Sequence, residues 1–296
     1  MKIYAFIVTF NRFELLKRVV ECLRNQTYKI DKILVVNNAS TDGTSEWLAI
    51  QPDLFVINQE NLGGAGGFHT GVKYCYEDGA DWIWMMDDDV FPEKDCLENL
   101  LKYTKISPCI NMNRYYSDGV VVPCPYWYYQ KNYKDNLFYD EATDNQYVKE
   151  PDGVCFEGLL IKKDIVSQIG FPDKDFFVAG DDTTYGYRAV KICTPILVKS
   201  AKAVRQAKST EKSLRPLTTY YTVRNRHLIK KYNKRYNLNI PVSKWPIYYI
   251  YVPIKRILVC LTDNSEINRK LMKSVIYGII DNLKQLTGST FFLHKI

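Results

Sequence analysis

The chain has 296 residues, of which 46% are hydrophobic and 25% charged, with a formal net charge of +7. This is the composition of a soluble globular protein, large enough for one domain or a domain with an appendage. The eight cysteines are scattered without a C-x-x-C pair, and there are only three histidines. The pattern argues against a disulfide scaffold, a zinc site or a histidine-rich metal site, and it is typical of a reducing cytosol.

The charge is unevenly distributed along the chain. Residues 1–198 carry 20 Lys and Arg against 29 Asp and Glu, a net charge of −9. Residues 199–256 carry 15 Lys and Arg against Glu211 alone, a net charge of +14. A basic block of this kind indicates an anionic partner, such as phosphate groups, a membrane surface or nucleic acid. The alternative is a solvated helical face, although such a face normally mixes both signs.

The first ninety residues predict strands that alternate with helices. The apolar run at 2–9 predicts a first strand rather than a signal peptide, because polar Asn11 and Arg12 follow at once. Further strands are expected at 32–36, 54–57 and 82–86, helices at 13–24, 44–50 and 71–77, and a glycine-rich turn at 61–67. This order predicts an α/β fold with a mostly parallel, Rossmann-like sheet flanked by helices.

The rest of the chain has a less regular pattern. We expect strands at 120–123 and 156–161, a long loop or irregular hairpin at 126–144, and a short helix at 163–169 that ends at Gly170 and Pro172. Beyond Lys199 the chain is basic and is expected to be mainly helical. We therefore divide it into a catalytic domain, 1–205, and a basic helical C-terminal region, 206–296.

Residues 245–261 form the most apolar stretch of the C-terminal region. They contain two prolines and the pair Lys255-Arg256, so they do not supply the roughly 20 apolar residues that a membrane-spanning helix needs. An interfacial segment with aromatic and basic flanks fits the pattern, as does burial against the catalytic domain.

Three consecutive aspartates, Asp87, Asp88 and Asp89, follow directly after the apolar strand at 82–86. Ligands collect at the carboxyl ends of parallel strands, and strand alternation lets Asp87 and Asp89 point one way and Asp88 the other. Adjacent carboxylates resist burial unless something positive compensates them. A hard divalent cation is a suitable compensator, since Mg²⁺ is held by one or two carboxylates together with substrate phosphates. The alternative is a solvated acidic turn.

Two further motifs suit the same site. The glycine-rich stretch 61–67 precedes a helix, where glycines let the backbone approach a phosphate; an ordinary turn is the alternative. A second acid pair, Asp181 and Asp182, lies in G-D-D-T-T-Y-G-Y-R. A carboxylate near a metal, but not bound to it, can remove a proton from an attacking hydroxyl. The alternative is a helix N-terminus, where acids are favoured.

Five motifs together resemble a known family. V-T-F-N-R, V-N-N-A-S-T-D-G-T, E-N-L-G-G-A-G-G-F, M-D-D-D-V and G-D-D-T-T-Y-G-Y-R-A, in this order, are similar to the family 2 inverting glycosyltransferases of GT-A fold. The bacterial galactofuranosyl- and rhamnosyltransferase-like branch is the most similar. The resemblance covers roughly residues 1–200 and continues weakly through Y-Y-x-x-R-N at 220–225 and Y-G-I-x-D-N-L at 277–283. In the first of these, Tyr220, Arg224 and Asn225 resemble a helix that helps to hold phosphate or acceptor.

The resemblance implies a role for each matching position. Asp87 and Asp89 would hold Mg²⁺ or Mn²⁺ on the diphosphate of a nucleotide sugar. Asp182 would be the general base, and Asp181 would orient the acceptor. Asp88 would contact the ribose or the donor sugar. The other residues expected to contact the nucleotide sugar are Thr9, Asn11, Arg12, Asn38, Asp42, Asn61, Gly63, Gly64 and Arg224.

The chain departs from the family pattern at two places. The family often has an acid where Asn37 or Asn38 stands, which bears on recognition of the base. Galactofuranosyltransferases of this type often supply a metal-binding His after the second acid motif, where this chain has A-V-R-Q at 203–206. Either Gln206 replaces that His, or the metal is held by fewer protein ligands.

The expected reaction is a direct displacement at the anomeric carbon that inverts its configuration. The donor would be a nucleoside-diphosphate sugar, with UDP-galactofuranose favoured over dTDP-rhamnose or another UDP-hexose. The acceptor would be a lipid-linked glycan or polysaccharide, with the protein cytoplasmic and peripheral at an anionic inner membrane face. A nucleotidyltransferase and a non-catalytic glycan- or membrane-binding module are the rivals. Nucleic-acid binding is not expected, because the basic block contains no recognised module.

Overall fold

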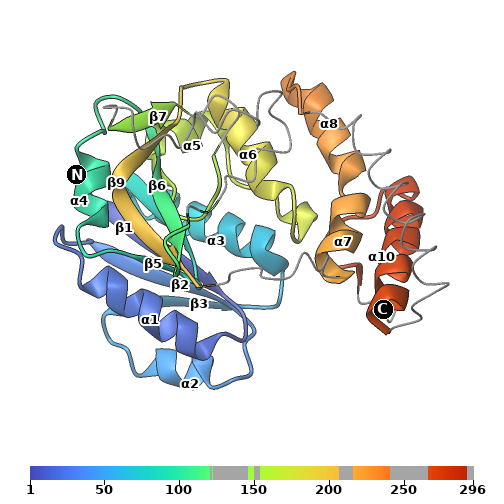
Figure 1. Cartoon of the computed structure of the whole chain (residues 1–296), viewed down its shortest axis with the longest axis horizontal. Helices are drawn as coiled ribbons and strands as arrows, with labels where there is room; N and C mark the ends of the chain where they lie inside the picture. The colour runs from blue at the N-terminus through green and yellow to red at the C-terminus, as the bar shows by residue number, and fades with distance from the viewer. Residues whose placement is uncertain (121, 123–145, 150–153, 207–215, 241–265, 292–296) are drawn as a thin grey trace.

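The computed structural model describes the chain except for residues 121, 123–145, 150–153, 207–215, 241–265 and 292–296. The described part is built around a nine-stranded sheet with strand order β3-β2-β1-β4-β8-β6-β9-β5, and β7 pairs with β9. Helices cover both faces of the sheet, and α7, α8 and α10 lie together beyond α3 and α6 (Figure 1). The predicted α/β class with a helical C-terminal region is confirmed.

The first half of the sheet follows the predicted order of elements. β2, β1 and β4 are parallel neighbours, with β3 parallel to β2 at the edge. The antiparallel pairings elsewhere join three residues or fewer per strand. The bounds are β1 (Ile3–Thr9), α1 (Phe13–Arg24), β2 (Lys32–Asn38), α2 (Thr44–Ala49), β3 (Leu54–Gln59), α3 (Gly63–Glu77) and β4 (Trp82–Asp87).

The two faces of these strands bury alternate residues in separate cores. On one face Ile3, Ala5 and Ile7 of β1 pack in the core that contains Leu16, Val20 and the rest of the buried side of α1. On the other face Tyr4, Phe6 and Val8 pack with the buried side of α3. Burial on both faces explains why these strands are continuous apolar runs rather than alternating ones.

The glycine-rich stretch is a correction to the predicted turn, because α3 already begins at Gly63. A Cβ at Gly67 would lie 2.3 Å from a Val8 methyl, and one at Gly71 would lie 2.4 Å from the Phe6 ring. These glycines therefore let α3 pack closely on the sheet, which a pattern of local turn preferences does not reveal.

The second half of the sheet differs more from the prediction. The unpredicted strand β6 (Cys109–Tyr116) pairs in parallel with β9 (Ile196–Arg205), which continues through the stretch after Lys199 that we expected to be helical. The strand expected at 156–161 is shortened to β8 (Leu160–Lys162). Of the strand expected at 120–123, Val120 and Val122 are described and lie in no strand. The other strands are β5 (Val90–Pro92) and β7 (Tyr147–Lys149).

The remaining helices complete the layers. Helix α5 (Lys163–Ile169) matches the prediction and ends at Gly170, whose φ of 73° suits glycine. The others are α4 (Cys96–Leu101), the 3₁₀ turn η3 (Lys174–Phe176), α6 (Asp181–Val190), α7 (Pro216–Arg224), α8 (Arg226–Tyr236) and α10 (Glu266–Leu283). Both the loop expected at 126–144 and the apolar segment 245–261 lie outside the described residues.

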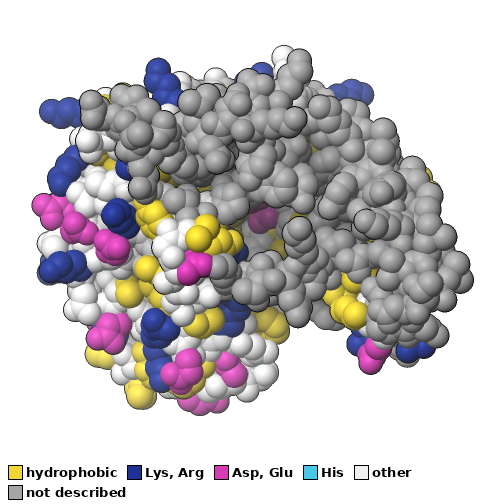
Figure 2. Space-filling model, viewed as in Figure 1, with side chains coloured by type: hydrophobic (Ala, Val, Ile, Leu, Met, Phe, Trp, Pro, Cys, Tyr) yellow, Lys and Arg dark blue, Asp and Glu magenta, His cyan; other side chains and the backbone are white. Residues whose placement is uncertain are grey.

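Two surface properties bear on membrane binding. In the described ranges, every helix is too short or too polar to cross a bilayer. Figure 2 shows acidic and basic side chains interspersed over the described part of one face, around the sheet. On that face the described residues form a mixed-charge surface rather than a field of one sign.

Candidate active site

The carboxyl ends of the parallel strands bring the first candidate residues together. Thr9 is in register with Asn37, and Val8 with Asp87, so the ends of β1, β2 and β4 meet at one edge of the sheet. This is the edge at which open α/β sheets bind ligands.

The loops after β1 and β2 are bonded to one another. The backbone N–H of Asn11 donates to Ser40 Oγ at 3.0 Å, and Asn11 Oδ1 accepts from Thr41 N–H at 2.7 Å. Asn11 has a φ of 51°, so this contact holds an uncommon left-handed backbone. Asp42 accepts from the N–H of Phe13 at 2.9 Å. These candidate residues therefore shape the loop pair through their own hydrogen bonds.

The electrostatics of Asp42 follow from these bonds. Burial by itself raises the pKa of Asp42, but the hydrogen bonds from Thr44 and Phe13 outweigh it and lower the pKa below its ordinary value. Asp42 is therefore a carboxylate at neutral pH.

Two candidate residues, Asn38 and Asn61, form hydrogen bonds with the start of α3. Asn38 Nδ2 donates to the carbonyl of Gly63 at 3.0 Å, and Asn61 Oδ1 accepts from the Gly63 N–H at 3.0 Å. A Cβ at Gly63 would lie 2.1 Å from the Phe177 carbonyl oxygen, whereas a Cβ at Gly64 would have nothing within 4 Å. Gly63 is thus packed against the segment before α6, while Gly64 borders open space.

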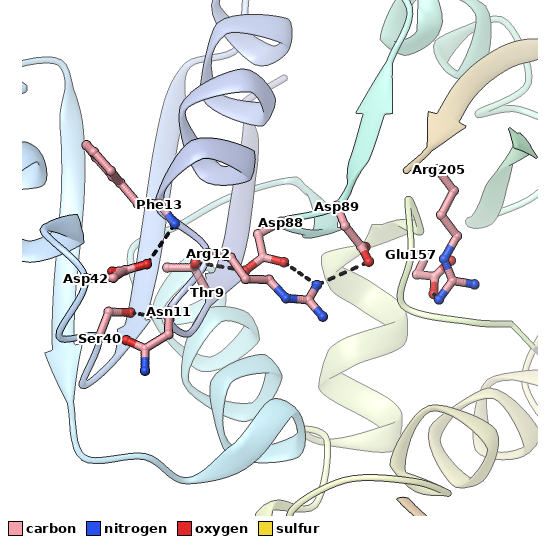
Figure 3. Close-up of polar contacts among 10 residues, drawn as sticks. All are labelled: Thr9, Asn11, Arg12, Phe13, Ser40, Asp42, Asp88, Asp89, Glu157 and Arg205. Atoms are coloured by element: carbon pink, nitrogen blue, oxygen red, sulfur yellow. Dashed lines mark hydrogen bonds and ion pairs between the residues drawn. The ribbon is translucent and has the colours of Figure 1, made fainter. Parts of the chain in front are cut away.

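The three aspartates, the first acidic segment (residues 87–89), form a charged cluster with Arg12. Thr9 Oγ1 donates to Asp88 at 2.8 Å, and Arg12 lies 2.9 Å from Asp88 and 3.2 Å from Asp89 (Figure 3). The predicted alternation of Asp88 and Asp89 is wrong, since both carboxylates face the same guanidinium. The reason is that β4 ends at Asp87 and the chain turns before β5.

Asp87 lies in surroundings that disfavour its charge. Burial raises its pKa well above the ordinary value, and the negative charges of Glu157, Asp89 and Asp88 raise it further, against the opposing effect of Arg205. A divalent cation would relieve this repulsion, and the donor set is one of hard oxygen ligands.

Glu157 is a site residue that the sequence patterns did not identify. Its carboxylate pairs with Arg114 and lies 3.2 Å from Arg205, beside the first acidic segment (Figure 3). Its charge raises the pKa of both Asp87 and Asp182, so it lies near both. An acid inside the otherwise apolar run at 154–161 was the available signal.

The second acidic segment, Asp181 and Asp182, begins α6. Burial and the adjacent Asp182 charge raise the pKa of Asp181 to about 8. Burial also raises the pKa of Asp182, and Glu157 adds to it, against a hydrogen bond from the Thr183 N–H at 2.6 Å. The shared electrostatic neighbour Glu157 brings the two acidic segments to the same region.

Two residues predicted to bind the metal or the nucleotide sugar, Gln206 and Arg224, make other contacts in the structure. The backbone N–H of Gln206 donates to the Asp89 carbonyl at 3.0 Å, but its side chain accepts from Arg18 at 3.4 Å. Arg224 is a correction: it is 0% exposed, and its guanidinium donates to four backbone carbonyls. Its burial and its hydrogen bonds indicate that it joins residues 175–176 to residues 286–288 rather than contacting a nucleotide sugar.

Metal binding has a limited set of protein ligands. In the part of the chain that the structure describes, His, Cys, Asp and Glu side chains do not gather in groups of three or more that could hold a metal ion. One or two carboxylates of the first acidic segment, together with ligand phosphates and water, remain a chemically suitable set for Mg²⁺ or Mn²⁺.

Comparison with known proteins identifies a family and several relatives of this chain. The family model for glycosyl transferase family 2 matches residues 4–170. Galactofuranosyltransferase GlfT1 of Mycolicibacterium smegmatis is 30% identical over 200 residues, covering 64% of this chain and 66% of that relative. The match thus spans just under two thirds of that relative's length. The dTDP-rhamnosyl transferase RfbF of Shigella flexneri is 23% identical over 97% of both chains.

Solved structures share the fold. TarS residues 1–349 of S. aureus, in complex with UDP-GlcNAc, aligns with a TM-score of 0.61 at 12% identity, over 97% of this chain and 82% of TarS 1–349. The mannosyltransferase PcManGT of Pyrobaculum calidifontis, in complex with GDP-Man and Mn²⁺, gives 0.55 at 16% identity, over 95% and 87%. These likenesses confirm the GT-A fold.

The sheet, its acidic edge and the family match define the class of the protein. The chain belongs to glycosyl transferase family 2. This confirms the family that the five sequence motifs resemble, with galactofuranosyl- and rhamnosyltransferases among its relatives.

Proposed function

We propose that this protein is a metal-dependent inverting glycosyltransferase that moves a sugar from a nucleoside-diphosphate donor to a glycan acceptor. The observation that carries the proposal is Glu157, whose charge acts on Asp87 of the first acidic segment and on Asp182 of the second. A direct displacement needs the metal-bound diphosphate and the general base in one pocket, and a shared charged neighbour supports that arrangement.

The donor would bind at the edge formed by β1, β2 and β4. Asp87 and Asp89 would hold Mg²⁺ or Mn²⁺, which supplies charge stabilisation for the departing nucleoside diphosphate. Asp88 would contact the ribose or sugar, while Gly64 would allow close approach of the backbone. The walls of the donor site would be formed by residues that shape the loops through their contacts with one another: Thr9, Asn11, Arg12, Asn38, Asp42, Asn61 and Gly63.

The two acids of the second segment would divide the proton chemistry. Asp182 would accept the proton of the attacking hydroxyl. Asp181, with its pKa raised to about 8, carries a proton at neutral pH and would donate a hydrogen bond that orients the acceptor. A single base opposite a metal-bound leaving group predicts inversion at the anomeric carbon.

The substrate assignment is supported by the relatives. UDP-galactofuranose is the favoured donor, because galactofuranosyltransferases match at up to 30% identity; dTDP-rhamnose or another UDP-hexose is the alternative, because RfbF matches along nearly the whole chain. The acceptor would be a lipid-linked glycan or polysaccharide used for the cell surface.

The proposed division of the chain falls at residue 205, where β9 ends. Residues 1–205 would bind the donor, and residues 206–296 would contact the acceptor and the membrane interface. With 15 Lys and Arg against Glu211 alone, residues 199–256 suit an anionic membrane surface. We therefore propose a cytoplasmic, peripheral location at the inner face of a bacterial membrane.

The test is the Asp182→Asn variant with a panel of nucleotide sugars and Mn²⁺. Thermal shift identifies the donor, and calorimetry should give the variant wild-type donor affinity. Transfer should fall by about 10²–10⁴-fold, the usual contribution of a general base. Transfer at the wild-type rate would remove the base assignment. Donor binding without transfer or hydrolysis by the wild-type protein would favour a non-catalytic binding module, and release of pyrophosphate a nucleotidyltransferase.

A further inference from the structure

The segment 175–180, directly before the second acidic segment, has a strained backbone. Phe177 has φ 63° and ψ −59°, and the Val178 N–H donates to the Phe176 carbonyl at 2.8 Å, which together make a γ-turn of the rare, strained type. Ala179 follows with a φ of 70°. Such conformations cost about 1–3 kcal/mol each and persist only where surrounding groups fix them.

Asn225, at the junction of α7 and α8, is the side chain that contacts this strained backbone most fully. It is 0% exposed. Its Nδ2 group donates to the carbonyls of Phe176, Val178 and Ala179 at 3.0, 2.9 and 2.8 Å. One side-chain amide thus binds three carbonyls of the strained segment.

Neighbouring residues of α7 reinforce the same contact. Arg224 donates to the carbonyls of Asp175 and Phe176, both at 3.1 Å. The Phe177 ring stacks on Tyr221, with centroids 4.9 Å apart. Helix α10 in turn holds this junction, because Asn282 Nδ2 donates to the Arg224 carbonyl at 2.8 Å.

The segment also contacts the proposed donor side. The Phe177 carbonyl accepts from the Ala65 N–H at 3.0 Å, near the start of α3. The Gly180 carbonyl accepts from Thr184 Oγ1 at 2.6 Å, within the first turn of α6. The strained segment therefore joins the start of α3, which borders the donor site, to the start of α6, which carries the acids.

We propose that Asn225 is a positioning residue, whose buried carboxamide fixes the strained segment and thereby places Asp181 and Asp182 in the site. The C-terminal helices then act on the geometry of the proton transfer, in addition to any contact with acceptor or membrane. This inference rests on the proposed role of Asp182 as the general base. Asn225 itself need not touch either substrate.

The experiment removes the carboxamide and then relieves the strain. Asn225→Ala should lower kcat for transfer from UDP-galactofuranose with Mn²⁺, or from dTDP-rhamnose if the panel selects it, by about 100-fold, the effect of a misplacement near 1 Å. Donor KM and donor affinity by calorimetry should stay within about threefold. Hydrogen exchange should rise at the amides of 178–184 and stay unchanged in β1.

A second substitution separates positioning from general stability. Glycine adopts a positive φ without the Cβ penalty, so Ala179→Gly in the Asn225→Ala background should recover kcat by at least about fivefold. Ala179→Gly alone should transfer within about twofold of wild type. If Asn225→Ala does not fold, Asn225→Ser, which keeps one donating hydrogen, takes its place with the same readouts.

Three results would overturn the proposal: kcat of the folded Asn225 variant within about threefold of wild type, a loss accounted for by donor KM, or no recovery with Ala179→Gly. The outcomes separate this proposal from the proposed function. If Asp182→Asn is inactive but the Asn225 variant is fully active, only the positioning role fails. If Asp182→Asn is active, the base assignment fails whatever Asn225 does.

Discussion

The two acidic segments of the site are stabilised in different ways. In the first, Arg12 lies within 3.2 Å of both Asp88 and Asp89, so two of the three carboxylates face a fixed cation. In the second, burial raises the pKa of both Asp181 and Asp182, and the hydrogen bond to Asp182 comes from the Thr183 N–H of its own helix. Burial also raises the pKa of Asp88, against the opposing charge and hydrogen bond of Arg12, and the charge of Arg114 opposes the rise at Asp182. The ion pairs with Arg12 therefore distinguish the first segment, whereas burial acts on both.

This difference suggests a division of labour along one edge of the molecule. The first segment suits a cation and a diphosphate, which gains negative charge as it leaves the sugar. The second suits a hydroxyl that gives up a proton. Glu157, paired with Arg114 and Arg205, lies between these two environments and adds negative charge to both.

The largest expected effect comes from the first segment. Asp87→Asn should reduce metal-dependent transfer by about 10³-fold, because a metal ion contributes several kcal/mol to the charge stabilisation of the leaving group. Calorimetry with and without Mn²⁺ should also lose the metal-dependent part of donor binding. Asp164→Asn, which removes a surface carboxylate paired with Lys162, is the control and should leave both unchanged. A wild-type response of Asp87→Asn to Mn²⁺ would exclude Asp87 as a ligand.

The next prediction concerns the second segment, where Asp181 should make the stability of the fold depend on pH. The folded pKa of Asp181, about 8, lies above its unfolded value of about 4, so the folded state binds the proton more tightly. Stability should therefore fall as pH rises from about 4 to 8. Relative to Asp181→Asn, the wild type should lose on the order of 3 kcal/mol between pH 5 and 7.5 in urea unfolding.

Asp53 is a control for this experiment, because its contribution to stability should change with pH in the opposite direction. The hydrogen bond from Arg24 lowers the pKa of Asp53, so its contribution is present above the unfolded pKa and is lost as pH falls. The pair is exposed, and its effect should be below about 1 kcal/mol. Equal pH profiles for wild type and Asp181→Asn would mean that Asp181 is ionised at neutral pH.

The next largest effect is expected at the contact between Gly63, at the start of α3, and the Phe177 carbonyl, in the segment before α6. Gly63→Ala should destabilise the fold by about 2–3 kcal/mol and lower transfer, since its φ is 70° and its Cβ would lie 2.1 Å from the Phe177 carbonyl. Gly64→Ala is the matched control, because its Cβ meets nothing within 4 Å. It should keep stability within about 1 kcal/mol and weaken donor binding where the backbone approaches a phosphate. Equal stability of the two variants would show that the contact is not tight.

Prediction from the sequence succeeded where the signal was local. The apolar strands and amphipathic α1 of the first ninety residues have the predicted order and nearly the predicted bounds, because each buries a pattern that its own residues define. The first acidic segment was located for the same reason, since three aspartates follow a buried strand. The turn at Asp88 and Asp89 was missed, because strand alternation was extended two residues beyond the end of β4.

Prediction failed where distant pairing decides the structure. Strand β9 extends through a basic stretch because it pairs with β6 and β5, and neither partner is close in sequence. Arg224 looked like a ligand residue by its charge, yet its neighbours are carbonyls from residues 175–176 and from beyond α10. The sequence does not single out Glu157, because its arginine partners lie on β6 and β9, two strands that the sequence pattern does not predict.

The smallest effect is expected from replacing Arg12, the cation that faces the first segment. Arg12 is 40% exposed at its side chain, so solvent screens its pairs, and Arg12→Met should cost only about 1–2 kcal/mol at pH 7. Without the guanidinium the folded pKa of Asp88 rises further, so the deficit should shrink as pH falls and the carboxyl protonates. Millimolar Mg²⁺ should raise the Tm of the variant more than that of wild type, because it supplies the missing positive charge. A deficit independent of both pH and Mg²⁺ would mean that Arg12 acts by packing alone, and the contrast between the two acidic segments would lose its electrostatic basis.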